Sequence, residues 1–162
     1  MIKNPLLFFS MQLDDTPNLN HGRLFLMDPE RKGIVGRWIA TSGVGQDQGI
    51  GEWSKQRGGV IPPNYHLQGV PIYQVSTNPI WQSLDGINTN TYLIEPVTVT
   101  TTDGVKRSEL LIHKSRHSNP VSASLGCIVL PQAEFTSFEA AYKEECSHLT
   151  QVPLLVGYTY DV

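Results

Sequence analysis

Short runs of β-branched and aromatic residues, separated by turn-forming residues, recur along most of this chain of 162 residues. Residues 23–27 and 33–40 flank a stretch that reads Asp-Pro-Glu-Arg-Lys, which is typical of a hairpin with a longer loop. Residues 97–101 and 105–112 flank Asp103-Gly104, a dipeptide that tolerates the positive φ angles of a tight hairpin turn. This pattern predicts a mainly β fold.

A single stretch has helical spacing. Between Phe135 and Leu149, apolar residues recur every three or four positions, which predicts an amphipathic helix. Thr136 and Glu139 are spaced like a capping box near its start. Residues 152–160 return to strand-like composition, so we expect one mainly β domain over residues 1–162, of sheet or sandwich type, with one substantial helix.

Glycine is concentrated in residues 42–64, which are otherwise polar. Such a stretch is expected to be a surface excursion rather than core. It contains neither a P-loop Gly-Lys-Ser/Thr sequence nor a dinucleotide fingerprint, and no cofactor is predicted.

Overall charge and hydropathy exclude some classes of protein. Twelve Lys and Arg against fifteen Asp and Glu give a net charge of -3, which argues against a nucleic-acid surface built on counterion release. No window approaches eighteen apolar residues, so membrane insertion is not expected. Residues 1–10 carry an apolar run that is too short for a signal peptide and is interrupted by Pro5; we interpret them as a first strand, with no signal peptide visible.

The chemistry is concentrated in residues 104–130. Cys127 lies where a small-residue turn meets an apolar strand, and His113 ends another apolar strand fourteen positions upstream. Cysteine with histidine is the minimum for thiol nucleophilic catalysis, in which neighbouring amides receive the oxyanion. This segment holds four basic side chains and one acidic one, a neighbourhood that favours the thiolate and attracts a carboxylate-bearing substrate.

The same residues allow other interpretations. Cys127 could be a small buried hydrophobe, and His113, His117 and Cys127 could be the zinc ligands of a hydrolase. The other cysteine, Cys146, lies on the apolar face of the expected helix and is assigned to packing. The remaining histidines belong to no constellation that the sequence reveals: His21, His66 and His148.

Two short segments resemble the active-site signature of the L,D-transpeptidase catalytic domain. They are Ile112-His113 and Ser124-Leu-Gly-Cys-Ile128, which match a strand-end His followed by Ser/Thr-x-Gly-Cys and an apolar residue. Other similar pieces come in the family's order, in residues 22–26, 39–43 and 58–67, so the resemblance covers about residues 22–150. It implies a β-sandwich with one substantial helix after the catalytic Cys.

The chain departs from the family pattern at three points, and these indicate which members it is most similar to. Leu125 stands where typical members have His, Val129 stands where they have Asn or Arg, and the segment between His113 and Ser124 is shorter than theirs. These features make the chain more similar to the divergent L,D-transpeptidase-like effectors of bacterial type VI secretion, many of which trim peptidoglycan stems instead of cross-linking them.

The resemblance implies a role for each residue of the segment. Cys127 would attack the carbonyl between an L-centred diamino-acid position and a terminal D-amino acid, and His113 would act as base and acid, oriented by the backbone carbonyl of Lys114. The amides of Gly126 and Cys127 would receive the oxyanion, and Ser124 would shape the turn or contact substrate. The candidates for binding the stem's carboxylates are His117, Arg116 and Lys114. No cofactor or metal is implied.

Expected partners and location follow from that activity. The substrate would be the stem peptide of peptidoglycan, met in the periplasm or on the cell wall after delivery that does not use the Sec route; otherwise the chain would be cytoplasmic. An immunity protein is implied if the chain is an effector. The alternative is a noncatalytic cell-wall-binding or virion module on the same β scaffold, with an apolar platform formed by Trp38, Trp53, Trp81 and the tyrosines.

Overall fold

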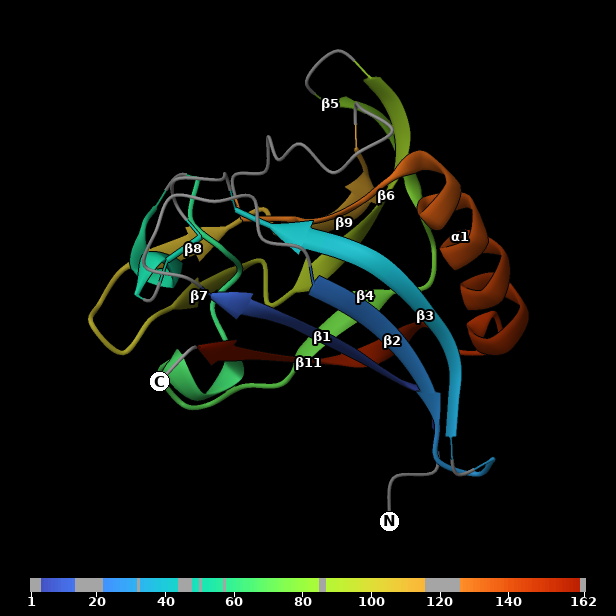
Figure 1. The fold of residues 1–162 in the computed structure, drawn as a ribbon, viewed down its shortest axis with the longest axis horizontal. Helices are drawn as coiled ribbons and strands as arrows, with labels where there is room; N and C mark the ends of the chain where they lie inside the picture. Colours follow the sequence, from blue (N-terminus) through green and yellow to red (C-terminus); the bar gives the residue numbers. More distant parts are fainter. Residues whose placement is uncertain are drawn as a thin grey trace.

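The computed structural model describes residues 4–13, 22–31, 33–43, 48–49, 51–56, 58–84, 87–115 and 126–160. Within these ranges it has a nine-stranded sheet, a two-stranded ribbon and one α-helix (Figure 1). The expectation of a mainly β fold with one helix is confirmed. The strands of the large sheet are β1 (Leu6–Leu13), β2 (Gly22–Asp28), β3 (Gly33–Ser42), β4 (Tyr73–Ser76), β5 (Ile80–Leu84), β6 (Ile87–Glu95), β9 (Leu111–Lys114), β10 (Ile128–Leu130) and β11 (Gln151–Tyr160).

The large sheet closes on itself. Its order is β4-β11-β1-β2-β3-β10-β9-β6-β5, and β4 also pairs with β6 through Gln74 opposite Glu95 and Val75 opposite Ile94. The expected sandwich is therefore wrong, because the sheet curls into a barrel with β5 attached outside the ring. Closure leaves the strands of the ring without a free edge, which two stacked sheets would not achieve.

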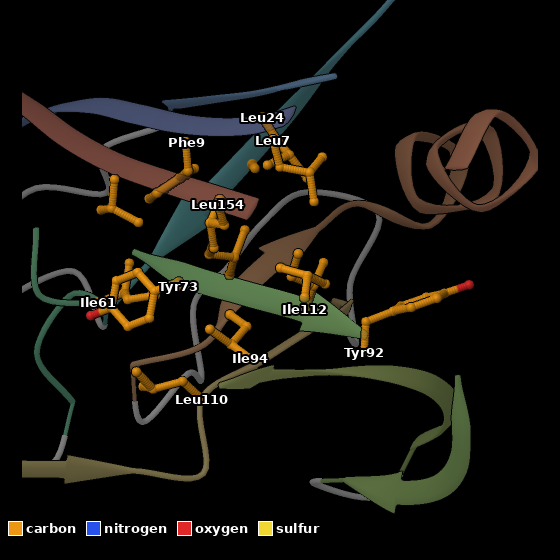
Figure 2. Packing of buried hydrophobic residues seen from close by; sticks show 14 of the residues in the cluster. Leu7, Phe9, Leu24, Ile61, Tyr73, Tyr92, Ile94, Leu110, Ile112 and Leu154 are labelled. Atoms are coloured by element: carbon orange, nitrogen blue, oxygen red, sulfur yellow. The ribbon is translucent and has the colours of Figure 1, made fainter. Parts of the chain in front are cut away.

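The core fills the interior of this barrel. Along β1 the residues alternate, so that Leu7, Phe9, Met11 and Leu13 are fully or almost fully buried, as expected for a strand with one face inward. Phe9 lies opposite Leu24 of β2. Figure 2 shows Leu7, Phe9 and Leu24 together with Ile112 of β9 and Leu154 of β11 in the common interior.

The helix α1 (Gln132–Cys146) covers one end of the barrel (Figure 1). Its expected apolar face is buried, and Phe138 makes edge-on ring contacts with Trp38 of β3 at 5.3 Å and Tyr92 of β6 at 5.6 Å. The expected capping box is wrong, because the Thr136 hydroxyl donates to the carbonyl of Gln132 inside the helix. The helix instead begins directly after Pro131, whose fixed φ suits a helix start.

The opposite end of the barrel is filled by the glycine-rich segment. Two short 3-10 helices, η2 (Glu52–Ser54) and η3 (Asn64–His66), lie there, and Trp53, Val60 and Ile61 are buried. The hydroxyl groups of Tyr73 and Tyr158 donate to carbonyls of this segment. The expectation of a surface excursion is therefore wrong for the buried part of this segment. A high glycine content indicates unusual backbone conformations, not exposure. Here the segment covers the open end of the barrel. We call residues 51–56 and 58–64, which fill this end, the end plug.

The two expected hairpins differ in outcome. β2 and β3 form the first hairpin as predicted. In the second, β7 (Thr98–Thr100) and β8 (Lys106–Ser108) pair across a turn in which Gly104 has φ of 89°. The expected strand over residues 105–112 is broken, however, because Glu109 has φ of 57° and the chain leaves the ribbon to enter β9 in the barrel.

Candidate active site

The candidate base lies on β9, and the candidate nucleophile directly precedes the neighbouring strand β10. β9 and β10 are parallel, with Val129 opposite His113 and Ile128 opposite Ile112. Ile112 and Ile128 are in the core, so His113 and Val129 face outward, and alternation brings Cys127 to the same side as Val129.

His113 is held in one orientation. It is nearly buried, and its Nδ1 lies 2.9 Å from the carbonyl oxygen of Lys114, the contact that the sequence comparison led us to expect. Because a carbonyl only accepts hydrogen bonds, Nδ1 carries the proton. The other nitrogen, Nε2, is therefore the acceptor of the neutral ring and can take a proton from a thiol.

The backbone before Cys127 is also fixed. Gly126 has φ of 113°, and its carbonyl accepts a hydrogen bond from the Ser42 hydroxyl at 3.3 Å. Ser42 also accepts the N–H of Ile61 at 2.9 Å. In a trans peptide the N–H points opposite to the carbonyl, so the amide of Cys127 is directed away from Ser42 of β3.

The thiol itself is 8% exposed, and its Sγ lies 3.7 Å from the carbonyl oxygen of Glu109. That carbonyl belongs to the left-handed residue where the chain passes from the ribbon to the barrel. The side chain of Glu109 is exposed, so the residue presents its backbone, and not its carboxylate, to the sulfur.

Arg107 of β8 lies behind the same backbone. It is 2% exposed and donates to three carbonyls of the end plug, those of Trp53, Gly59 and Val60, at 2.6 to 3.0 Å. Burial lowers the pKa of Arg107, while its electrostatic interactions with Tyr158, Tyr73 and Cys127 act in the opposite direction. From the sequence, Arg107 was recognised only as one of the four basic residues in the segment 104–130.

Buried polar side chains flank the pair. Thr91 of β6 lies opposite His113, and Thr41 of β3 lies opposite Val129. Both are fully buried, and they accept hydrogen bonds from Gln82 at 2.7 Å and Gln48 at 2.9 Å. Polar side chains from three strands, Thr41, His113 and Thr91, thus lie in one row across the sheet, with Val129 of β10 between Thr41 and His113. In the sequence, the signal for this row is that polar and apolar residues alternate along each strand. Alternation alone does not tell which residues face the interior of the barrel and which face outward.

Three predicted site residues cannot be placed: Ser124, His117 and Arg116 lie outside the described residues. Lys114 is half-buried at the end of β9. Among the described residues, no group of three or more His, Cys, Asp and Glu side chains could hold a metal ion. His117, which the zinc interpretation needs, is not among them, so that interpretation stays a hypothesis.

A second polar cluster corrects the expectation that His66 has no constellation. The Ser54 hydroxyl donates to the Asp103 carboxylate at 2.7 Å, and Nε2 of His66 lies 3.3 Å from Ser54 and 3.6 Å from Asp103. Hydrogen bonds from Thr101 and Ser54 lower the pKa of Asp103. In a serine triad, the base receives the serine proton and the acid binds its other ring nitrogen. Here the Asp103 carboxylate itself accepts the hydrogen bond of the Ser54 hydroxyl, so His66 does not activate Ser54. The cluster instead links Ser54 of the end plug to Asp103 in the turn of the β7–β8 ribbon.

The aromatic platform of the noncatalytic alternative is not present as expected. Trp38 and Trp53 are buried, and only Trp81 of the three, on β5, is largely exposed, at 67%. Trp53 instead stacks on Tyr158 with ring centroids 6.4 Å apart. The three tryptophans therefore form no common surface.

Comparison with models of known families, with curated proteins and with solved structures gave no significant match. In the described part of the chain, no helix has the length and apolar character needed to cross a membrane. The functional interpretation therefore depends on the geometry of the site and on the resemblance found in the sequence.

Proposed function

We propose that the chain is a cysteine-dependent peptidoglycan-modifying enzyme, an L,D-carboxypeptidase or L,D-transpeptidase, that acts on the terminal D-amino acid of stem tetrapeptides. The observation that carries the proposal is the pairing of β9 with β10. The pairing sets His113 of β9 beside β10, the strand that Cys127 directly precedes, and Nδ1 of His113 lies 2.9 Å from the carbonyl oxygen of Lys114.

Acylation begins with proton transfer from the Cys127 thiol to Nε2 of His113. The sulfur forms a bond to the carbonyl carbon before the terminal D-amino acid, and the N–H of Cys127 receives the negative charge that develops on the carbonyl oxygen. Collapse of this intermediate breaks the C–N bond. His113 returns its proton to the departing amine, and a thioester remains on Cys127.

Deacylation uses the same two residues in reverse. Water that loses its proton to His113 attacks the thioester, breaks the C–S bond and yields a tripeptide with a free carboxylate. An amine from a second stem or a free D-amino acid gives a new peptide bond instead. The buried position of the thiol, at 8% exposure, limits the solvent that reaches this bond.

Delivery and regulation follow the effector resemblance. The proposed substrate lies in the periplasm or cell wall of a target cell, which the enzyme reaches without the Sec route. A producing cell then needs an immunity protein, and the surface around Cys127 is the part that such an inhibitor must cover.

Mass spectrometry of purified disaccharide tetrapeptides and pentapeptides tests the proposal. Wild type is expected to remove or exchange the terminal D-alanine of the tetrapeptide and to leave the pentapeptide, whose last bond joins two D-centres, unchanged. Cys127→Ala and His113→Ala should abolish the reaction, because each removes one member of the pair. Cys146→Ala is the matched control and should retain it. Unchanged tetrapeptides with a folded wild-type protein would contradict the assignment.

A further inference from the structure

A buried cation lies directly behind the candidate nucleophile. Arg107 is 2% exposed, and an added Cβ on Gly126 would lie 2.1 Å from its Nη2 atom. The guanidinium therefore packs against the backbone of the residue that precedes Cys127. Only glycine leaves room for this approach, and Gly126 also adopts the positive φ that glycine favours.

The end plug fixes this cation in place. Nη1 donates to the carbonyls of Trp53 and Val60, and Nη2 donates to that of Gly59. A guanidinium presents several donors in a rigid fork and stays protonated even when buried. Three bonds to one segment of backbone hold the charge where a flexible lysine would be free to move away.

We propose that Arg107 is a positioning residue that holds a permanent positive charge behind Cys127 and so stabilises the thiolate that attacks the substrate. This deepens the proposed function and rests on it. When the thiol proton moves from Sγ to Nε2 of His113, the new negative charge on sulfur faces a fixed cation in a site shielded from water, where charge interactions are stronger than in bulk water.

The other charged groups around Cys127 do not cancel the positive charge of Arg107. On β9, Lys114 and the imidazolium form of His113 are positive, and the exposed Glu109 carboxylate points to solvent. On the inner side, burial raises the pKa of both Tyr73 on β4 and Tyr158 on β11, so both are neutral at neutral pH. The described charged groups around Cys127 are therefore mainly positive, whereas the Glu109 carbonyl, 3.7 Å from Sγ, accepts from the thiol and favours its protonated form.

Two substitutions of Arg107 separate charge from structure. Arg107→Met and Arg107→Lys both lose the forked bonds to the end plug, but only lysine retains a positive charge. The pKa of the Cys127 thiol is measured from the pH dependence of its alkylation by iodoacetamide in a Cys146→Ala background. We expect Arg107→Met to raise this pKa by about 1 to 3 and Arg107→Lys to recover part of the change. Arg37→Met, which removes an exposed arginine, should leave it unchanged.

An equal thiol pKa in wild type and Arg107→Met would overturn the inference, as would equal shifts in the Met and Lys variants. A second measurement does not depend on folding of either variant. In His113→Ala, the Cys127 thiol should still titrate below the ordinary cysteine value of about 8.5, because Arg107 remains, and an ordinary or higher value would again overturn the inference. A low, Arg107-dependent thiol pKa without activity on tetrapeptides would contradict the proposed function alone.

Discussion

Cys127 and Cys146 are both buried thiols, yet their surroundings give them different chemistry. Cys146 lies among apolar side chains at the end of α1, and burial raises its pKa to about 12. Cys127 follows Gly126, against which the guanidinium of Arg107 packs, and it directly precedes β10, the strand that pairs with the strand of His113. The difference between the two residues is therefore in what surrounds the sulfur and not in how deeply it is buried.

Alkylation of the native protein at pH 7 is expected to modify Cys127 and to spare Cys146, since the thiolate is the reacting form. His113→Ala should slow the reaction of Cys127, because the sulfur loses its base. Mass spectrometry of the alkylated peptides gives both rates, and denatured protein should react at both positions. Equal rates for wild type and His113→Ala would show that the imidazole does not act on this thiol.

At the scale of single residues, the sequence indicated those candidate site residues that belong to one short motif. His113, Cys127 and Gly126 were found from their spacing and from the strands around them, and the contact between His113 and the Lys114 carbonyl was expected. Ser42 and Arg107 were not assigned roles at the nucleophile. Ser42 and Arg107 contact the backbone before Cys127 only because the fold brings distant parts of the chain together. A motif of neighbouring residues does not reveal such contacts.

At the scale of elements, α1 is hydrogen-bonded to β3, the strand that holds the backbone before Cys127. The Glu134 carboxylate accepts the backbone N–H of Ile39 at 2.8 Å. Ile39 lies on β3, whose last residue, Ser42, holds the carbonyl of Gly126. The contact fills a hydrogen-bond position that strand pairing leaves open on β3, so the helix also stabilises the strand.

Glu134→Ala is expected to lower the free energy of unfolding by about 1 to 3 kcal/mol, because the half-buried N–H of Ile39 loses its acceptor. Urea denaturation followed by circular dichroism measures the change. Glu134→Gln retains an acceptor oxygen and should stay close to wild type. Glu144→Ala, at an exposed position of the same helix, controls for helix propensity. A loss with Glu144→Ala as large as with Glu134→Ala would contradict the proposed tie.

Local elements were predicted well where neighbouring residues decide them. The β2–β3 hairpin, the Asp103-Gly104 turn and the apolar face of α1 follow from short-range signals. The break at Glu109 did not, because no glycine or proline within residues 105–112 marks it. Only the need to enter the barrel explains why a non-glycine residue adopts a left-handed conformation there.

At the scale of the whole molecule, the barrel is closed at its ends by aromatic residues with polar tips. The Tyr142 hydroxyl of α1 donates to the carbonyl of Val75 on β4, while Tyr73 and Tyr158 donate to the end plug. The sequence could not predict this closure, because the β4–β6 pairing involves only two residue pairs and neither is marked in the sequence. Both ends thus depend on phenol groups that must stay protonated.

High pH is therefore expected to unfold the protein cooperatively. Burial raises the pKa of four tyrosines above the ordinary value: Tyr73, Tyr92, Tyr142 and Tyr158. Below pH of about 10, both states keep these protons and the groups add no pH dependence. Above it, the unfolded chain loses them and the folded chain does not, so each tyrosine lowers the free energy of unfolding by about 1.4 kcal/mol per pH unit.

Urea denaturation at several pH values between 9 and 11 measures that slope, and ultraviolet absorbance of the phenolate reports ionisation. Tyr142→Phe removes one titrating group, so its slope above pH 10 should be shallower by about 1.4 kcal/mol per pH unit. Below pH 9 the variant should show only a constant difference from wild type, since it loses the bond to Val75. Ionisation of the four tyrosines in protein that is still folded would mean that water reaches the barrel ends, and the closure described here would not hold in solution.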